Sequence, residues 1–321
     1  MTECLVADVG GTHIRIARMA DAMAIPDCHR KYRCADFPDI EAAFECYLHE
    51  TGLSRPDHVA LAVASAVTGD LIQLTNSAWR FSQTTLKQHF SLKSLLVLND
   101  FEALALSLPH IAPEDLCPVG GGHAIIHAPM AVIGPGTGLG VGAIVSNTST
   151  SWLPISSEGG HMTLSPATVF ESELLRAAWK ERQHISAEAF LSGTGLPILY
   201  RAIGSVRGEP FDAAITADQI GSSASAGRDA LCSLTINTFC EMLGTMAGNV
   251  ALLFCARGGV FIGGGIVPKI LPLFITSGFR TRFESKGRYA DYLAAIPTTV
   301  ITGETATLSG LAAAMGETLS G

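Results

Sequence analysis

The sequence contains no Gly-Lys pair, no Cys-x-x-Cys pair and few charged residues. Without adjacent Gly and Lys there is no Walker A phosphate loop. Only 16% of the residues are charged and 48% are hydrophobic, a balance typical of a globular protein and not of a disordered one. The net charge of −8 argues against a nucleic-acid or acidic-membrane partner, because both demand a basic surface.

The eight cysteines are scattered, and the chain starts without the positively charged, apolar leader of a secreted protein. Reduced thiols and a cytoplasmic location are therefore expected. The most apolar stretch, residues 259–275, is interrupted by glycines, prolines and Lys269, so it does not predict a membrane span. The length of 321 residues suits about two domains.

Three glycine-rich turns are the most informative feature that is present, and each follows an apolar run with the character of a β-strand. They are Asp8-Val9-Gly10-Gly11-Thr12, Gly136-Thr137-Gly138 and Gly263-Gly264-Gly265. Glycine lets backbone N–H groups approach an anion closely, so one such turn indicates a phosphate and three converging turns indicate a nucleotide. We expect a polyphosphate bound between two halves of the chain.

Strand and helix patterns alternate along the chain, which predicts an α/β fold with mixed sheets. Strands are expected at 5–7, 14–19, 58–64, 71–75, 95–98, 130–133, 141–145 and 260–262, and helices at 38–52, 229–256, 267–275 and 305–315. The last helix is expected to pack back onto the first domain. The small, polar segment 204–227 is interpreted as a surface excursion.

A dinucleotide-binding fingerprint is nearly present in Gly138-x-Gly140-x-x-Ala143, with Glu158 about 20 residues further on. That pattern must open a helix, whereas residues 141–145 are rich in β-branched side chains. A dehydrogenase is therefore disfavoured.

Further motifs, together with the three turns, resemble the sugar kinase, Hsp70 and actin superfamily, and within it the bacterial ATP-dependent glucokinases. These motifs are Leu98-Asn99-Asp100-Phe101, Glu158-Gly159-Gly160-His161, Ser186-Ala187-Glu188, Leu191-Ser192-Gly193, and Thr68-Gly69-Asp70 followed by Thr75-Asn76. The similarity covers nearly the whole chain in order and spacing. It implies a two-domain, actin-like ATPase fold of the ribonuclease H type, in which mixed sheets are flanked by helices. A cleft would separate a small domain, residues 1–110 and 301–321, from a large domain, residues 111–300.

The resemblance also implies an activity and its site. The chain would transfer the γ-phosphoryl group of ATP to the 6-hydroxyl of D-glucose at the entry to glycolysis, and it would form a homodimer. The first two glycine turns would hold the phosphates and the third the adenosine. Mg²⁺ would be held mainly by the ATP phosphates, with Asp8 reaching it through water and no protein metal site. The sugar would contact Asn76, Asn99, Asp100, Glu158, His161 and Glu188, with Asp100 as the general base.

The residues themselves leave simpler interpretations open. Asn99-Asp100 also suits the N-cap of a helix beginning at Phe101, because Asp is a preferred capping residue. Glu158 is equally suited to a solvated loop, and Glu188 to the negative charge that favours a helix N-terminus.

Zinc is excluded for His161. The zinc site that some sugar kinases and repressors build on such a histidine needs a downstream cysteine cluster, and no cysteine lies between Cys117 and Cys232. Two departures from the family pattern are His13, where asparagine is common, and Thr194, where proline is frequent.

Two other classes of protein share part of the pattern. An ATP-driven binding module of the Hsp70 or actin kind shares the phosphate turns but needs neither the Glu-Gly-Gly-His turn nor a base at Asp100. A sugar-sensing regulator needs a DNA-binding domain, for which we expect no room before the first strand.

Overall fold

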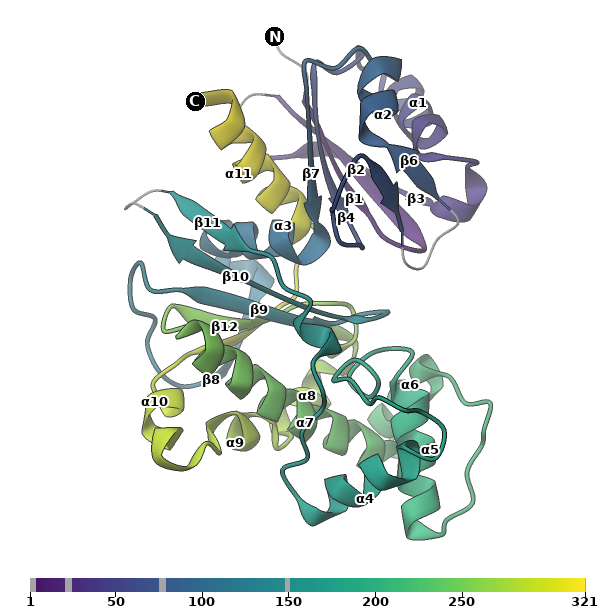
Figure 1. Cartoon of the computed structure of the whole chain (residues 1–321), viewed down its shortest axis with the longest axis vertical. Helices are drawn as coiled ribbons and strands as arrows, with labels where there is room; N and C mark the ends of the chain where they lie inside the picture. The colour runs from purple at the N-terminus through teal and green to yellow at the C-terminus, as the bar shows by residue number, and fades with distance from the viewer. Residues whose placement is uncertain (1–3, 21–24, 75–78, 148–150, 321) are drawn as a thin grey trace. The chain divides into compact units, whose positions relative to one another are not determined.

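A computed structural model describes residues 4–20, 25–74, 79–147 and 151–320 (Figure 1). By their internal contacts the residues form two compact units. Unit 1 comprises Met1–Pro113, Trp152–Ser156 and Gly303–Gly321, and unit 2 comprises Glu114–Ser151 and Ser157–Thr302. The domain limits expected from the sequence, at 110 and 300, stay predictions, as does the cleft.

Unit 1 contains a five-stranded mixed sheet with the order β3-β2-β1-β4-β7. Its strands are β1 (Cys4–Val9), β2 (His13–Met19), β3 (Asp27–Arg33), β4 (His58–Val63) and β7 (Ser94–Asn99). β1 runs antiparallel to β2 and parallel to β4, which is in turn parallel to β7. A separate ribbon consists of β5 (Leu71–Gln73) and β6 (Arg80–Ser82).

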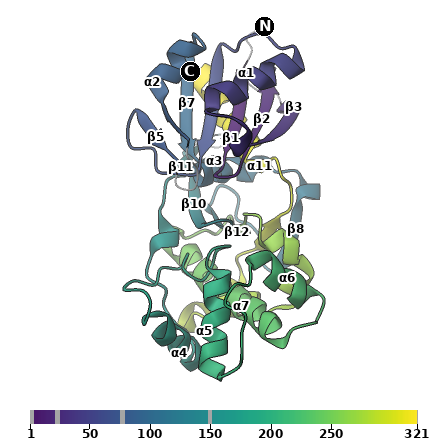
Figure 2. The ribbon, with the colours of Figure 1, turned by 90° about the vertical axis from the view of Figure 1, so that its right-hand side faces the viewer.

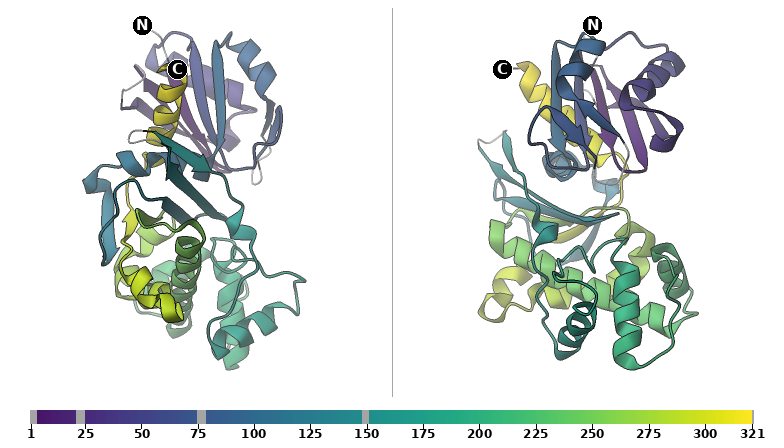
Figure 3. Two further views of the ribbon diagram at one scale, coloured as in Figure 1. Left: turned by 60° about the vertical axis from the view of Figure 1, so that its left-hand side comes forward. Right: turned by 45° about the vertical axis from the view of Figure 1, so that its right-hand side comes forward.

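Side chains of β1 alternate between two apolar cores, as a strand covered on both faces requires. Leu5, Ala7 and Val9 pack in the core that includes helix α1 (Ile40–Thr51) and helix α2 (Gln83–His89). Cys4 and Val6 pack instead with helices α3 (Asp100–Ser107) and α11 (Ala306–Ser320), seen beside the strands in Figure 3.

Local signals set the ends of helix α1. The Asp39 side chain accepts a hydrogen bond from Ala42 N at 2.8 Å, and Gly52 ends the helix with a φ of 67°. Asp is a preferred N-cap, and glycine adopts a left-handed φ without a side-chain clash.

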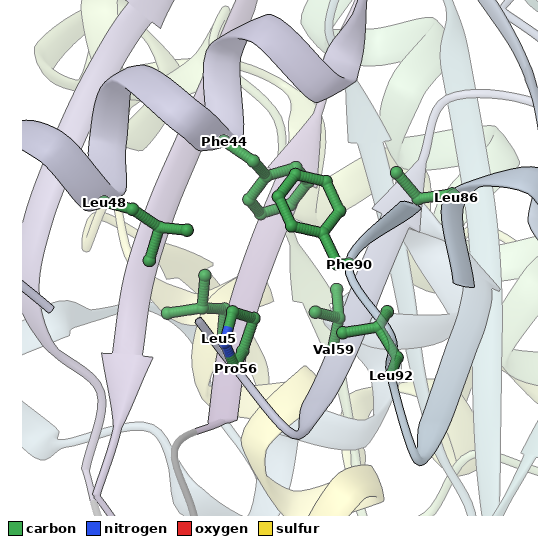
Figure 4. A pocket seen from close by; sticks show the side chains of 8 residues that line it. All are labelled: Leu5, Phe44, Leu48, Pro56, Val59, Leu86, Phe90 and Leu92. Atoms are coloured by element: carbon green, nitrogen blue, oxygen red, sulfur yellow. The ribbon is translucent and has the colours of Figure 1, made fainter. Parts of the chain in front are cut away.

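A small apolar gap lies in the first core of unit 1 (Figure 4). Its walls come from β1, β4, α1, α2 and the neighbouring loops, through Leu5, Phe44, Leu48, Pro56, Val59, Leu86, Phe90 and Leu92. The gap has no room for a water-sized molecule, so it is a packing feature and not a ligand site.

A second mixed sheet has the six-stranded order β11-β10-β9-β12-β13-β8. Five of its strands belong to unit 2, namely β8 (Leu116–Gly120), β9 (Met130–Pro135), β10 (Leu139–Ser146), β12 (Gly259–Ile262) and β13 (Thr298–Ile301), and β11 (Trp152–Ile155) belongs to unit 1. β9 pairs antiparallel with β10 and parallel with β12. This repeats the arrangement of β2, β1 and β4, so the expected strand, glycine turn and returning strand occur once in each unit.

The helices of unit 2 gather around the long α7 (Figure 2). They are α4 (Val169–Ala178), α5 (Leu196–Arg207), α6 (Ala217–Ser225), α7 (Ala230–Phe254), α8 (Leu271–Thr276), α9 (Phe279–Glu284) and α10 (Ala290–Ala294). Short 3-10 turns in the chain are Cys34–Asp36, Leu108–His110, Pro113–Asp115, Gly159–His161, Val267–Ile270 and Gly287–Tyr289. A Cβ on Gly244 of α7 would lie 2.2 Å from the Phe279 carbonyl oxygen, so glycine is what lets α9 approach.

The interpretation of residues 204–227 as a surface excursion is wrong. α5 continues to Arg207, and α6 occupies Ala217–Ser225. Thr216 and Gln219 form a reciprocal capping box, and Ile220 and Ala224 are buried. The small polar residues obscured an amphipathic helix, whose buried residues Ile220 and Ala224 are four positions apart and so lie on one face.

The α/β architecture with two mixed sheets flanked by helices confirms the predicted fold class. No helix in the described part of the chain is both long enough and apolar enough to cross a membrane.

Candidate active site

The first glycine turn joins β1 to β2. Gly10 N donates to His13 O at 3.0 Å, which closes the turn. Among the described residues, the N–H groups of Gly11 and Thr12 have no acceptor. Two adjacent amides without acceptors form the kind of concavity that binds an anionic oxygen.

Asp8 lies directly opposite Arg15 in the β1–β2 ladder, and Asp8 Oδ2 is 3.0 Å from Arg15 Nη1. The Asp8 side chain is 15% exposed. Burial raises the pKa of Asp8, and the Arg15 guanidinium opposes that rise by its charge and its hydrogen bond. Sequence reasoning missed Arg15, although its position three residues after Thr12 on a returning strand was a usable signal.

His13, where the family commonly has asparagine, opens β2 opposite Arg33 of β3. Burial and the neighbouring cations Lys31, Arg15 and Arg33 lower the pKa of His13. A neutral imidazole therefore lies beside the first turn.

Asn99 and Asp100 lie at the carboxyl edge of the same sheet. The ladder places Val9 of β1, Val63 of β4 and Asn99 of β7 in one row across it. The first glycine turn and Asp100 therefore follow strands that end at the same edge, where α/β proteins bind ligands.

The helix after β7 begins one residue earlier than expected. Asn99 is its N-cap, since Asn99 Oδ1 accepts from Phe101 N at 2.9 Å and from Glu102 N at 3.4 Å. Asn99 Nδ2 donates to Ser65 O at 3.2 Å. The cap that the sequence offered at Asn99-Asp100 is thus present, and the helix begins at Asp100, one residue before Phe101. Asp100 is half-buried, and the helix N-terminus favours negative charge there.

The second glycine turn, between β9 and β10, has the design of the first. Gly136 N donates to Gly138 O at 2.8 Å, and in the described ranges the N–H groups of Thr137 and Gly138 have no acceptor. The next amide, Leu139 N, donates to Glu188 Oε2 at 2.8 Å. A predicted sugar ligand thus contacts a predicted phosphate turn.

The Glu158–His161 turn packs against β10 through its two glycines. A Cβ on Gly160 would lie 1.9 Å from Leu139 O, so only glycine fits. Glu188 N donates to Gly160 O at 2.9 Å. Glu158 and His161 are exposed at the two ends of the turn. Within unit 2 the structure therefore brings together the Glu158–His161 turn, Glu188 and the second glycine turn.

The third glycine turn follows β12 and lies beside the second. Gly263 N donates to Ile133 O at 2.9 Å, and Ile266 N donates to Pro135 O at 3.2 Å. Gly264 has a φ of 76°, and a Cβ there would lie 2.4 Å from Pro135 O. Gly264 is thus required both by its conformation and by close contact.

Some predicted relationships stay untested. Asn76 lies outside the described residues. Asp8, Asn99 and Asp100 belong to unit 1, whereas Glu158, His161 and Glu188 belong to unit 2, so their convergence on one ligand stays a prediction. No group of three or more His, Cys, Asp or Glu side chains in the described part of the chain is arranged to hold a metal ion.

Comparison with known proteins gives consistent matches. The glucokinase family model matches residues 5–318. A curated glucokinase of Paramagnetospirillum magneticum is 45% identical over 313 residues, covering 96% of each chain. The crystal structure of a glucokinase from an Antarctic psychrotroph has a TM-score of 0.88 and 36% identity, covering 99% of each chain.

A more distant solved structure shares the fold. It is a ROK family glucokinase from Streptomyces griseus in complex with glucose and AMPPNP, with a TM-score of 0.64 and 18% identity over 97% of this chain and 98% of that one. The architecture is that of the actin-like ATPase sugar kinases, as the sequence motifs indicated. The family match over nearly the whole length, together with these relatives, shows that the chain belongs to the glucokinase family.

Proposed function

We propose that this chain transfers the γ-phosphoryl group of magnesium-ATP to the 6-hydroxyl of D-glucose, with Asp100 as the general base. The observation that carries the proposal is the 2.8 Å hydrogen bond from Leu139 N to Glu188 Oε2. It puts an acceptor suited to sugar hydroxyls in contact with a turn suited to phosphate. Support also comes from the glucose and AMPPNP in the Streptomyces griseus complex.

The nucleotide occupies the three glycine turns in this proposal. The paired amides of Gly11-Thr12 and Thr137-Gly138 bind phosphate oxygens, and Gly263-Gly264-Gly265 receives the adenosine. Mg²⁺ is held mainly by the phosphates, and Asp8 contacts it through water. The ion neutralises the charge that develops on the transferred group.

The sugar contacts the polar side chains of the predicted site that do not bind the nucleotide. Glu158, Glu188, His161, Asn99 and Asn76 bind its hydroxyls, while Asp100 accepts the proton of the 6-hydroxyl. The sugar oxygen then forms a bond to the γ-phosphorus as the bond from that phosphorus to the ADP oxygen breaks. From the family membership we also propose that the protein is a cytoplasmic homodimer and that it acts at the entry to glycolysis.

The test is a coupled assay of ADP release with the purified protein, ATP and Mg²⁺ against glucose, mannose and glucosamine. We expect sugar-dependent ADP release with the highest kcat/KM for glucose, and glucose 6-phosphate as the product. ADP release that does not depend on any hexose would instead indicate an ATP-driven binding module. A higher kcat/KM for mannose or glucosamine would reassign the substrate.

A further inference from the structure

The segment from Glu188 to Thr194 holds the second phosphate turn at three points. The three hydrogen bonds run from Leu139 N to Glu188 Oε2 at 2.8 Å, from Gly193 N to Gly136 O at 2.8 Å, and from Thr194 Oγ1 to Thr137 O at 3.3 Å. Each residue from Gly136 to Leu139, apart from Gly138, is therefore anchored by this segment.

The contact at Gly138 is tight. A Cβ there would lie 2.3 Å from Glu188 Oε2, so the carboxylate fills the space beside the turn that a side chain would otherwise take. Glu188 is only half-buried, and its own backbone is fixed by the bond from Glu188 N to Gly160 O. The carboxylate thus approaches the second glycine turn from a segment that is itself bonded to the Glu158–His161 turn, which packs against β10.

Of the three anchoring bonds, only the one from Leu139 ends on a charged group. Hydrogen bonds to an ionised acceptor are roughly twice as strong as neutral ones. Removal of the Glu188 side chain also leaves Leu139 N–H without its acceptor, whereas the bonds of Gly193 and Thr194 are neutral.

We propose that Glu188 is a positioning residue for the nucleotide, holding the second phosphate turn in its binding shape through the Leu139 amide. This role is additional to the sugar contact and rests on the proposed function only for the identity of the ligand. One carboxylate then serves two subsites of the same unit.

The negative charge of Glu188 and its hydrogen bond to Leu139 N–H have opposite effects on nucleotide affinity. Substitutions that remove one or both can therefore separate the two effects. A carboxylate beside the turn repels phosphates, so loss of its charge alone tightens nucleotide binding. Loss of the hydrogen bond loosens the turn and weakens nucleotide binding. Glu188→Gln removes only the charge, because an amide oxygen still accepts from Leu139 N–H. Glu188→Ala removes both.

The experiment is calorimetric titration of the full chain with AMPPNP and Mg²⁺ in the absence of sugar. We expect Glu188→Ala to bind AMPPNP about tenfold more weakly than the wild type, in line with the loss of a hydrogen bond to a charged group. Glu188→Gln should bind at least as tightly as the wild type. Glu181→Ala, which removes an exposed carboxylate elsewhere in unit 2, is the matched control and should leave the affinity unchanged.

The proposal is overturned if Glu188→Ala binds AMPPNP as tightly as the wild type, or if Glu188→Gln is weakened as much as Glu188→Ala. Should Glu188→Ala fail to fold, Glu188→Met preserves most of the side-chain volume without a carboxylate acceptor, and the same weakening is expected. A parallel titration with glucose alone separates the two roles. If glucose affinity is unchanged in both variants while the AMPPNP pattern holds, the sugar contact fails and the positioning role stands.

Discussion

Arg15 and Asp8 form an ion pair across the β1–β2 ladder, with 3.0 Å between Arg15 Nη1 and Asp8 Oδ2. Burial raises the pKa of Asp8 and Arg15 opposes that rise. The ion pair therefore helps to keep Asp8 ionised beside the first phosphate turn.

This pair predicts a shift in the pH dependence of activity. In the proposed function an ionised Asp8 attracts the metal of magnesium-ATP, so kcat/KM for ATP is expected to fall as the pH drops through the pKa of Asp8. Arg15→Met removes the group that lowers this pKa, so the acid limb of the pH profile moves to higher pH. Arg15→Lys keeps the positive charge and should shift the limb less. An acid limb at the same pH in all three proteins would contradict the assignment.

Replacement of Asp100 tests the general base. Asp100→Asn keeps the shape of the side chain but cannot accept the proton, so kcat should fall by roughly 10²–10⁴-fold. KM for glucose and for ATP should change little, because the lost interaction forms along the reaction path. The change at the first residue of α3 costs only about 0.5 kcal/mol of stability.

Asp36→Asn, at an exposed position of unit 1, is the control for the loss of one carboxylate and should keep full activity. Steady-state kinetics of both variants decide the matter. A kcat for Asp100→Asn within threefold of the wild type would remove Asp100 from the role of base.

We expect the substitution Gly160→Ala to lower both the stability and the activity of the protein. A Cβ in Gly160→Ala meets Leu139 O at 1.9 Å, so the Glu158–His161 turn must move away from β10. Overpacking of this kind costs about 1–3 kcal/mol. Urea unfolding should show the loss, and KM for glucose should rise.

Gly121→Ala is the matched control, because a Cβ at Gly121 meets nothing within 4 Å. Its stability should stay within about 0.5 kcal/mol of the wild type, as for most surface changes. Equal stability of Gly160→Ala and Gly121→Ala would show that the close approach to Leu139 is absent in solution.

A buried ion pair joins α4 to α9 in unit 2. Glu171, 2% exposed, has Oε1 at 2.7 Å from Arg282 Nη2, an ion pair whose angles fall short of a hydrogen bond. Its other oxygen accepts from Ala167 N at 2.6 Å. Glu171→Ala leaves the Arg282 guanidinium with only the Glu241 carboxylate at 3.7 Å and the Thr245 hydroxyl, and should cost about 3 kcal/mol, the low end for breaking a buried pair.

An exposed ion pair, with 3.0 Å between Lys269 Nζ and Asp218 Oδ1, serves as the comparison for that measurement. Asp218→Ala should cost no more than about 1 kcal/mol, because solvent screens an exposed pair. The midpoints of denaturant unfolding compare the two variants directly. Similar small losses in both would mean that water reaches Glu171.

Features set by neighbouring residues could be predicted from the sequence. The hairpin of β1 and β2 follows from apolar runs on either side of Gly10-Gly11, and α1 follows from its apolar spacing and from Gly52. The helix expected at 305–315 corresponds to α11, which begins at Ala306 and continues to Ser320. Each signal lies within a few residues of the structure that it specifies, so no knowledge of distant contacts is needed.

Features that depend on distant contacts could not be predicted in this way. Leu139 and Glu188 are 49 positions apart, and nothing in either neighbourhood indicates their hydrogen bond. Two adjacent residues, Asn99 and Asp100, were both suited to cap the start of α3. Asn99 is the N-cap, and its side-chain amide also donates to Ser65 O in the loop after β4, a contact that a local pattern does not reveal.

The route of the chain through unit 1 has a consequence for synthesis on the ribosome. Leu308, Leu311 and Met315 of α11 complete the core that Cys4 and Val6 begin. A Cβ on Gly310 would lie 1.8 Å from Ala103 O, so α11 and α3 interlock closely. The sheet face that carries Cys4 and Val6 therefore stays uncovered until α11 has been translated. The part of unit 1 that is translated first thus has its core completed last. Aggregation of the nascent chain, or binding by a chaperone, is expected at this exposed sheet face.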